Sequence, residues 1–284
     1  MKKVLMLICM LSTGSLAWAQ APSLGTAATF AVLGGTAVTC TSSVITGDVG
    51  VSPGSVVTNT SCAISGTVHQ NDSAATTARA DFLSAYSAIG LMPCTQTIST
   101  AAFTGNVPAL GPLAPGVYCF PAGVAFTDTT LTLDGSTNPN GIWIFKVGAA
   151  LAGSGFQVVM ANGAQACNVF WSVGAAATLT TSTLAPLFQG NLLAGNTVGG
   201  SITVTGGAVV GRALASVAVT LTGTNVNGVC TLVDQAKASC KNDDDDRDED
   251  KDHDRGDDHD RDRHEKNKHH HDRDDKDKDH RDQD

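Results

Sequence analysis

Threonine is the residue type whose abundance and spacing in this chain first suggest a chemical role. Between residues 20 and 240 the chain holds 31 threonines but only ten charged side chains, whereas about a quarter of the residues of a typical globular protein are charged. Several threonines alternate with apolar residues and would project from one side of an extended strand; they are Thr203, Thr205 and Thr220, and likewise Thr178 and Thr180. The polar surface of this region is therefore predicted to consist mainly of hydroxyl groups.

A regular array of threonines can organise water. Each hydroxyl can hydrogen-bond to a water molecule, while the neighbouring methyl group limits where that water can lie. The β-branched side chain is stiff at χ1, so ordering it costs little entropy, and charged groups with a competing hydration are scarce. The alternative is that threonine simply suits exposed positions of β-strands. Composition leaves both interpretations open.

Residue patterns that support catalysis are missing from the sequence of this region. His69 is its single histidine, and no nucleophile motif, phosphate-binding loop or zinc-ligand spacing accompanies it. We interpret His69 as a surface or capping residue and expect no catalytic residue, no cofactor and no metal site here. The acids are scattered, but residues distant in sequence can meet in a coiled fold, so a polysaccharide-cleaving site stays open as an alternative; the acids are Asp48, Asp72, Asp81, Asp128, Asp134 and Asp234.

The composition inverts after Cys240. Residues 241–284 contain 21 acidic and 12 basic side chains, a net charge of −9, and seven of the eight histidines. This tail has no apolar residue for a core, so we predict that it is disordered. It is either a solubilising spacer or a weak ligand for divalent cations or a charged surface; carboxylates suit calcium, and His269, His270 and His271 suit softer metals. Since the chain has no basic patch, a nucleic-acid partner is not expected.

The N-terminus has the pattern of an export signal. Lys2 and Lys3 precede an apolar run at 4–11, and Ala17 and Ala19 form a small-x-small cleavage site. The run is too short for a stable membrane anchor, and no other stretch is long and apolar enough to span a bilayer. We therefore expect residues 1–19 to be removed and the mature protein to be secreted and monomeric.

Seven cysteines remain after removal of the signal, and in an oxidising compartment most should pair. Local spacing suggests the pairs Cys40–Cys62, Cys94–Cys119 and Cys230–Cys240. Cys167, inside an apolar run, is then predicted to be a buried free thiol. Seven cysteines can pair in other ways, so this connectivity is a hypothesis.

Many short β-rich runs and one helix are predicted between these termini. The helix covers 73–89, since Ala75, Ala78, Phe82, Ala85 and Ile89 fall on one face, with Asp72 or Ser73 as its N-cap and Gly90 at its end. Residues 20–240 thus suit one mainly β domain, and a stacked β-helix fits the Thr, Val and Gly bias. In stacked coils the strands lie about 4.7–4.9 Å apart and outward side chains repeat about every 6.6–6.8 Å, so outward threonines would form a grid.

Six stretches, taken in order, resemble the bacterial and fungal ice-binding proteins of the DUF3494 type. They lie at 24–33, 45–54, 115–118, 140–145, 162–171 and 206–215. The resemblance covers about 24–232 and omits the acidic tail. It implies a discontinuous right-handed parallel β-helix, triangular in section, with one long α-helix packed alongside. It also implies that Asp48 and the Asn-Gly-Ala-Gln stretch belong to scaffold turns.

The resemblance further implies a partner, the ice crystal surface, bound by a flat face that in some members carries Thr-Ala/Gly-x-Thr/Asn. Two places match this pattern, beginning at Thr36 and at Thr222. The candidate ice-binding residues are Thr36, Thr39, Thr203, Thr205, Thr220, Thr222, Thr224 and Asn225.

Two other functions are kept as alternatives. One is an exported adhesion or matrix module that binds polysaccharide or protein, and the other is a carbohydrate-active enzyme. Few aromatic residues are available to stack on sugars, and Trp143 and Trp171 lie in runs that look buried. We therefore expect a secreted, non-enzymatic protein that adsorbs to ice and inhibits its growth or recrystallisation.

Overall fold

The computed structural model describes residues 21–105, 110–181 and 187–229. All of them belong to one compact unit. The predicted signal peptide, the Cys230–Cys240 pair and the acidic tail with its histidines lie outside the described residues.

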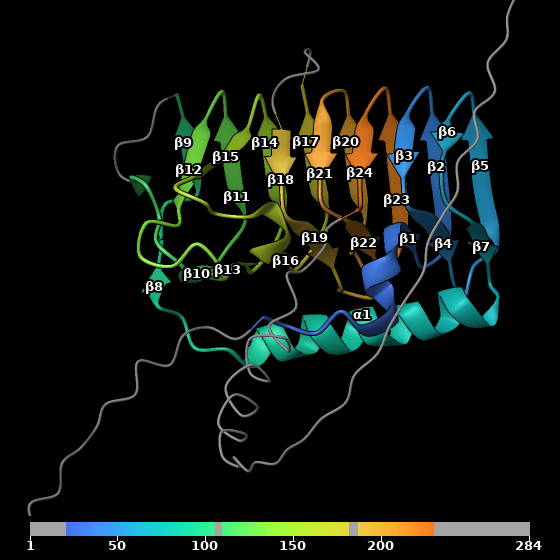
Figure 1. Cartoon of the computed structure of the whole chain (residues 1–284), viewed down its shortest axis with the longest axis horizontal. Helices are drawn as coiled ribbons and strands as arrows, with labels where there is room; N and C mark the ends of the chain where they lie inside the picture. Colours follow the sequence, from blue (N-terminus) through green and yellow to red (C-terminus); the bar gives the residue numbers. More distant parts are fainter. Residues whose placement is uncertain (1–20, 106–109, 182–186, 230–284) are drawn as a thin grey trace, which may run out of the picture. The chain divides into compact units, whose positions relative to one another are not determined.

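The described chain winds into stacked coils whose strands all pair in parallel (Figure 1). Sheet A contains, in spatial order, β7 (Val68–Gln70), β4 (Asp48–Val51), β1 (Phe30–Gly34), β22 (Ala213–Ala215), β19 (Asn191–Ala194), β16 (Val169–Val173), β13 (Trp143–Val147), β10 (Gly116–Phe120) and β8 (Gln96–Thr97). Sheet B contains β5 (Val56–Thr60), β2 (Ala37–Thr41), β23 (Ala218–Thr222), β20 (Ile202–Thr205), β17 (Ala177–Thr180), β14 (Leu151–Ser154), β11 (Val124–Thr127) and β9 (Ala102–Thr104).

The third side of the coils consists of two shorter sheets. One contains β18 (Leu187–Gln189), β21 (Ala208–Val210), β24 (Asn225–Asn227), β3 (Val44–Thr46) and β6 (Ala63–Ile64), and the other contains β12 (Thr130–Asp134) and β15 (Gln157–Ala161). Short 3₁₀ helices lie at Gly25–Thr29 (η1) and Ala166–Asn168 (η3). The predicted fold class, a β-helix with one packed α-helix, is confirmed.

The coils are not stacked in the order of the sequence. The first coil, β1 to β3, pairs with the last, β22 to β24, through registers such as Val32 with Ala213 and Thr39 with Thr220. After β7 the chain returns along sheet A as helix α1 (Ser73–Leu91), and then begins stacking again at β8 (Figure 1). The β-helix is therefore discontinuous, and strands nearly 200 residues apart lie side by side.

Burial explains which strands alternate between apolar and polar residues and which are apolar throughout. Sheet A is covered by the interior on one side and by α1 on the other, so β1, β10 and β16 are buried at every position. On the helix side, Ala78, Phe82, Ala85 and Ile89 pack with outward residues of sheet A; these include Leu33, Ile144, Phe170, Leu193 and Leu214. Sheet B is covered on one side only, so its strands alternate between buried and more exposed residues, except for the end strand β5, which has no buried residue.

Both ends of helix α1 have identifiable hydrogen-bond partners. Asp72 is the N-cap, since its carboxylate accepts from the Ala75 amide at 2.9 Å. The helix continues two residues beyond the predicted end at Ile89. There Lys146 Nζ donates to the carbonyls of Gly90 and Met92, each at 2.8 Å, and this satisfies acceptors that helix ends leave unpaired. No described helix is long and apolar enough to cross a membrane.

Two of the predicted disulfides are present, Cys40–Cys62 and Cys94–Cys119. The prediction for Cys167 is wrong, because this cysteine is disulfide-bonded and only partly buried. Cys167 lies in η3, and the buried strand β16 begins two residues later, at Val169. The cysteine therefore lies outside the buried run to which the sequence analysis assigned it.

Arg212 fastens the N-terminal segment to the last coil. Its side chain is 2% exposed, and its Nε and Nη2 donate to the Ala28 carbonyl at 2.9 and 2.6 Å, while Nη1 donates to Asn191 Oδ1 at 2.9 Å. Asn191 in turn donates to the carbonyls of Cys167 and Val169. Burial lowers the pKa of Arg212 to about 10, so the guanidinium stays protonated at neutral pH.

Replacing Arg212 by methionine is expected to destabilise the domain by about 1–3 kcal/mol, because buried acceptors of η1 and Asn191 lose their donor. The measurement is denaturant unfolding with the disulfides intact. Arg79→Met on α1 is the matched control and should change stability by less than about 0.5 kcal/mol, since Arg79 has a buried Nε without a hydrogen-bond partner. Equal effects of the two substitutions would show that the Arg212 contacts add nothing.

Candidate functional site

The outward side chains of sheet B form two straight files, one residue from each strand in each file. The registers place these residues opposite one another from strand to strand. The first file is Ala102, Ala125, Ala152, Thr178, Thr203, Thr220, Thr39 and Thr58. The second file is Thr104, Thr127, Ser154, Thr180, Thr205, Thr222, Thr41 and Thr60.

The two files make a grid of small uncharged side chains. Twelve of the sixteen positions are threonine, one is serine and three are alanine, and all are at least partly exposed. Neighbours within a file lie about 4.7–4.9 Å apart and the files about 6.6–6.8 Å from each other. The inward residue between the files is buried in every strand except the end strand β5, as in β20 with Val204.

A repeated turn keeps the second file straight. The residue after it has a positive φ in seven of the coils, at Gly105, Asp128, Gly155, Gly206, Gly223, Ser42 and Ser61. The amides at this corner donate to the second-file carbonyl of the next coil, for example Gly223 to Thr41 at 2.9 Å and Ser42 to Thr60 at 2.8 Å. Each coil therefore leaves sheet B at the same point, because a left-handed residue turns the chain there.

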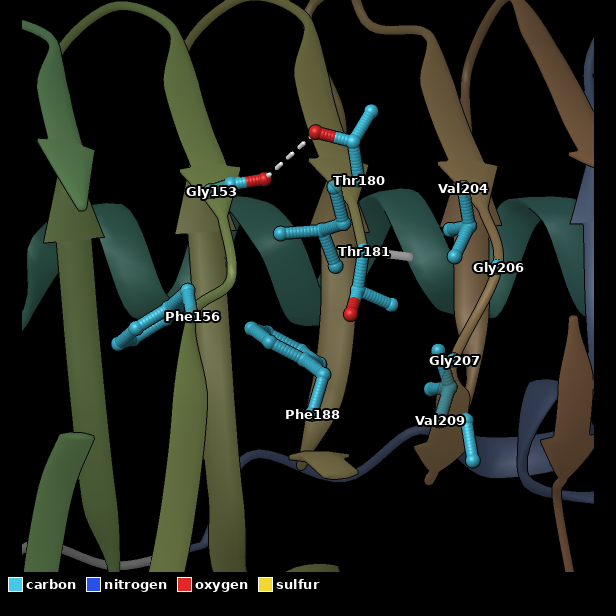
Figure 2. A pocket seen from close by; sticks show the side chains of 11 residues that line it. Gly153, Phe156, Thr180, Thr181, Phe188, Val204, Gly206, Gly207 and Val209 are labelled. Atoms are coloured by element: carbon cyan, nitrogen blue, oxygen red, sulfur yellow. Dashed lines mark hydrogen bonds between the residues drawn. The ribbon is translucent and has the colours of Figure 1, made fainter. Parts of the chain in front are cut away.

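The hydroxyl groups of the files are available to solvent. Among the file residues, only Thr180 uses its hydroxyl in a hydrogen bond within the described residues, donating to the Gly153 carbonyl at 3.4 Å (Figure 2). Threonines at the corners behave differently: the hydroxyls of Thr36, Thr129 and Thr224 all donate to backbone carbonyls. The protein thus uses threonine in two ways, and sheet B collects those with unused hydroxyls.

Five of the eight predicted residues belong to the files: Thr39, Thr203, Thr205, Thr220 and Thr222. The prediction for Thr224 is wrong, because this residue is 0% exposed and its hydroxyl donates to Gly207 O at 3.2 Å. The turn at Gly223 points Thr224 into the interior and carries Asn225 to β24, on the third side. Thr36 precedes β2 at a corner, where its hydroxyl donates to Val217 O at 3.0 Å.

Eleven file residues are absent from the predicted ice-binding set; the alternation of Thr178 and Thr180 was noted, and the other nine were missed although a signal for them exists. Each strand of sheet B ends in the pattern Ala/Thr-x-Thr/Ser followed by Gly, Ser, Asp or Thr. The pattern recurs at 39–42, 58–61, 102–105, 125–128, 152–155, 178–181, 203–206 and 220–223. Its irregular spacing hides it, because loops of different length separate the coils.

The other two sides lack such a grid. Sheet A is covered by α1. On the third side, the outward residues mix types without a repeat, as with Val44, Thr46, Asn225 and Asn227. Sheet B is therefore the exposed side with a regular chemical pattern.

Acidic groups of the described domain serve the scaffold. Asp72 caps α1 and contacts His69 Nδ1 at 2.7 Å, and its pKa is lowered, first by the Ala75 amide and then by His69. The pKa of Asp81 is lowered by hydrogen bonds from the amide and hydroxyl of Thr26. Within the described residues, no group of three or more His, Cys, Asp or Glu side chains could hold a metal ion.

A small hollow lies at the corner between sheet B and the third side (Figure 2). Phe156, Phe188, Val204 and Val209 line it, together with glycines and the ends of β17 and β20. Its described lining is mainly apolar, with Thr180 and Thr181 as its polar side chains and no charged one, so it offers few groups to fix the orientation of a small-molecule ligand.

Comparison with known proteins relates this architecture to one family. The sequence pattern of the family described as "Ice-binding-like" matches residues 32–227. An ice-binding protein of Nostoc sp. (strain HG1) is 36% identical over 226 residues, which cover 78% of this chain and 79% of the relative. An ice-binding protein of Flavobacterium frigoris (strain PS1) is 33% identical over 216 residues, covering 70% and 73%.

A solved structure supports the same family relationship. The crystal structure of the ice-binding protein from the Antarctic ascomycete Antarctomyces psychrotrophicus is 31% identical, with a TM-score of 0.66 over 75% of this chain and 100% of that one. With a family match over most of the described residues and relatives of this identity, the chain belongs to the ice-binding-like family.

Proposed function

We propose that this protein adsorbs to ice through sheet B, and that its adsorption inhibits ice growth or recrystallisation. The observation that carries the proposal is the two files of small side chains, whose hydroxyls, apart from that of Thr180, make no hydrogen bond within the described residues. The central contact is the threonine half, the five neighbouring strands β17, β20, β23, β2 and β5 that carry threonine in both files. The names of the relatives, all ice-binding proteins, support it.

The chemistry of the threonine half suits an ordered water layer. Its hydroxyls can bond to water, and its methyl groups offer water no partner, so neighbouring waters bond to one another. The side chains are stiff at χ1, and the backbone beneath them is held by ladders on both sides, except in the end strand β5, which pairs with β2 alone. The layer can therefore take positions that merge with a crystal face. Water held on a protein surface and ice then share one hydrogen-bond network.

The alternative of an adhesion module gains no support from this surface. The files contain no aromatic side chain to stack on sugar rings and no charge to pair with another protein. The proposal includes no catalytic activity. It does include export by residues 1–19, action as a monomer, and an accessory role for residues 241–284 as a spacer or as a weak ligand for cations or a charged surface.

Thr222→Tyr is expected to reduce thermal hysteresis several-fold, because the ring stands above the grid and holds it off the ice. Asn227→Tyr is the matched control, since Asn227 lies exposed on the third side of the same coil. Circular dichroism and thermal unfolding check that both variants fold. Full activity of a folded Thr222→Tyr variant would exclude sheet B as the contact.

Ice activity is expected to be independent of pH wherever the domain is folded, because no file residue titrates. Stability itself should depend on pH through Asp72 and Asp81. Their folded pKa values lie below the ordinary 3.8, so their stabilisation is complete above that pH and is lost as the pH falls below it.

The measurement is recrystallisation inhibition and thermal unfolding across the pH range from about 5 to 8, in which folded proteins are commonly most stable, followed by acidification. A change of activity near pH 6.5, where free histidines titrate, would instead implicate a histidine, and it would be assigned to the tail only if removal of residues 241–284 abolished it. Removal of residues 241–284 is the matched control and should leave the activity unchanged.

A further inference from the structure

We infer that the ice-contacting surface spans all eight strands of sheet B, and that Ala125 and Ala152 contact ice through their methyl groups. This inference rests on the proposed function and extends it to the alanine half, the strands β9, β11 and β14. These strands carry alanine in the first file and Thr104, Thr127 and Ser154 in the second.

The register makes the alanine half a direct continuation of the threonine half. Ala152 lies opposite Thr178 and Ser154 opposite Thr180, and the same pairing continues from β14 to β11 and β9. The Cβ of each alanine therefore occupies the position of a threonine Cβ. What is missing is one hydroxyl and one methyl per strand, and what remains is an exposed methyl group in the same file.

The second file keeps its chemistry across these strands. Thr104, Thr127 and Ser154 are exposed, and no hydrogen bond of their hydroxyls is recorded within the described part of the chain. The corner ladder also continues, with Gly105 donating to Thr127 O at 3.0 Å and Asp128 to Ser154 O at 2.7 Å. The second file therefore presents hydroxyls along its whole length, and in the alanine half the first file presents methyl groups beside them.

An aromatic stack supports this half from below. Phe103 and Phe126 stack at 5.2 Å between ring centroids with 12° between planes, and Phe126 and Phe156 at 4.2 Å with 9°. Gly153 allows this arrangement, because a Cβ there would lie 2.8 Å from Leu179 Cδ2 and 3.1 Å from Phe156 Cβ. Packed aromatic rings resist deformation, so the surface above them is as firm as the rest of the sheet.

The consequence is a longer contact. Five strands extend over four spacings, about 19 Å, and eight strands over seven, about 34 Å. Every added strand brings more lattice positions into simultaneous contact. Since simultaneous contacts must all break before the protein leaves, the alanine half should slow desorption from ice.

The test is Ala152→Tyr, compared with Val159→Tyr as a matched control. Val159 lies on β15 of the same coil, is 39% exposed, and faces the third side. Ala152→Tyr is expected to lower thermal hysteresis several-fold and Val159→Tyr to leave it at the wild-type value, with both variants folded by circular dichroism. Ala152→Thr, which extends the threonines of the first file by one strand, should retain at least full activity.

Two results would overturn the inference. If folded Ala152→Tyr is fully active while Thr222→Tyr is not, the contact ends at the threonine half. If folded Ala152→Thr loses activity, a threonine-like contact at this position is excluded. Failure of the proposed function is distinguishable, since Thr222→Tyr would then be as active as wild type, or the wild-type protein would show no activity at all.

Discussion

The parallel pairing of the first coil with the last coil is the constraint on which the rest of the structure depends. Strand β2 lies between β5 and β23, so Thr39 and Thr41 continue the files of Thr220 and Thr222. Without that pairing, sheet B would end at β23 and lose two strands of threonines. Arg212 strengthens the same junction, since it holds the Ala28 carbonyl just before β1. The surface of sheet B therefore depends on a junction between residues far apart in sequence. The hydrogen-bond ladder between the strands at this junction sets the alignment of the threonines.

The placement of the first coil also explains the helix. Because the N-terminal coils occupy one end of the stack, the chain must travel to the other end before it can fill the space between. An α-helix of 19 residues spans about 28 Å and satisfies its own backbone groups on the way. Its apolar face then covers sheet A, which explains the uninterrupted apolar strands there. Because the helix covers sheet A, and the third side has no regular pattern, sheet B is the side that presents a regular exposed surface.

Local features of this fold could be predicted from the sequence, and features that depend on stacking could not. The helix follows from apolar residues spaced at Ala78, Phe82, Ala85 and Ile89, and alternation along β20 and β23 places Thr203 and Thr220 outward. Thr224 and Asn225 were misplaced because a single left-handed residue, Gly223, changes which side of the coil the following residues face. The alanines were overlooked since only the register with Thr178 gives them a role. Because loop lengths between coils vary, the sequence has no fixed repeat period from which that register could be predicted.

Counting threonines cannot separate the two uses that this protein makes of them. At a corner, a threonine hydroxyl turns back to a carbonyl, as Thr129 does to Thr127 O and Thr224 to Gly207 O. Each of these carbonyls also accepts a backbone amide, from Gly105 and Asn225, so the hydroxyl adds a second hydrogen bond that fixes the turn. On sheet B the outward hydroxyls face solvent, and among the file residues only that of Thr180 bonds back to a carbonyl within the described residues, at the long distance of 3.4 Å. The distinction is therefore whether a backbone carbonyl lies within reach of the hydroxyl. A threonine in the middle of a fully paired parallel sheet is free to act on solvent, and a grid of such threonines arises wherever the coils leave the sheet at the same residue.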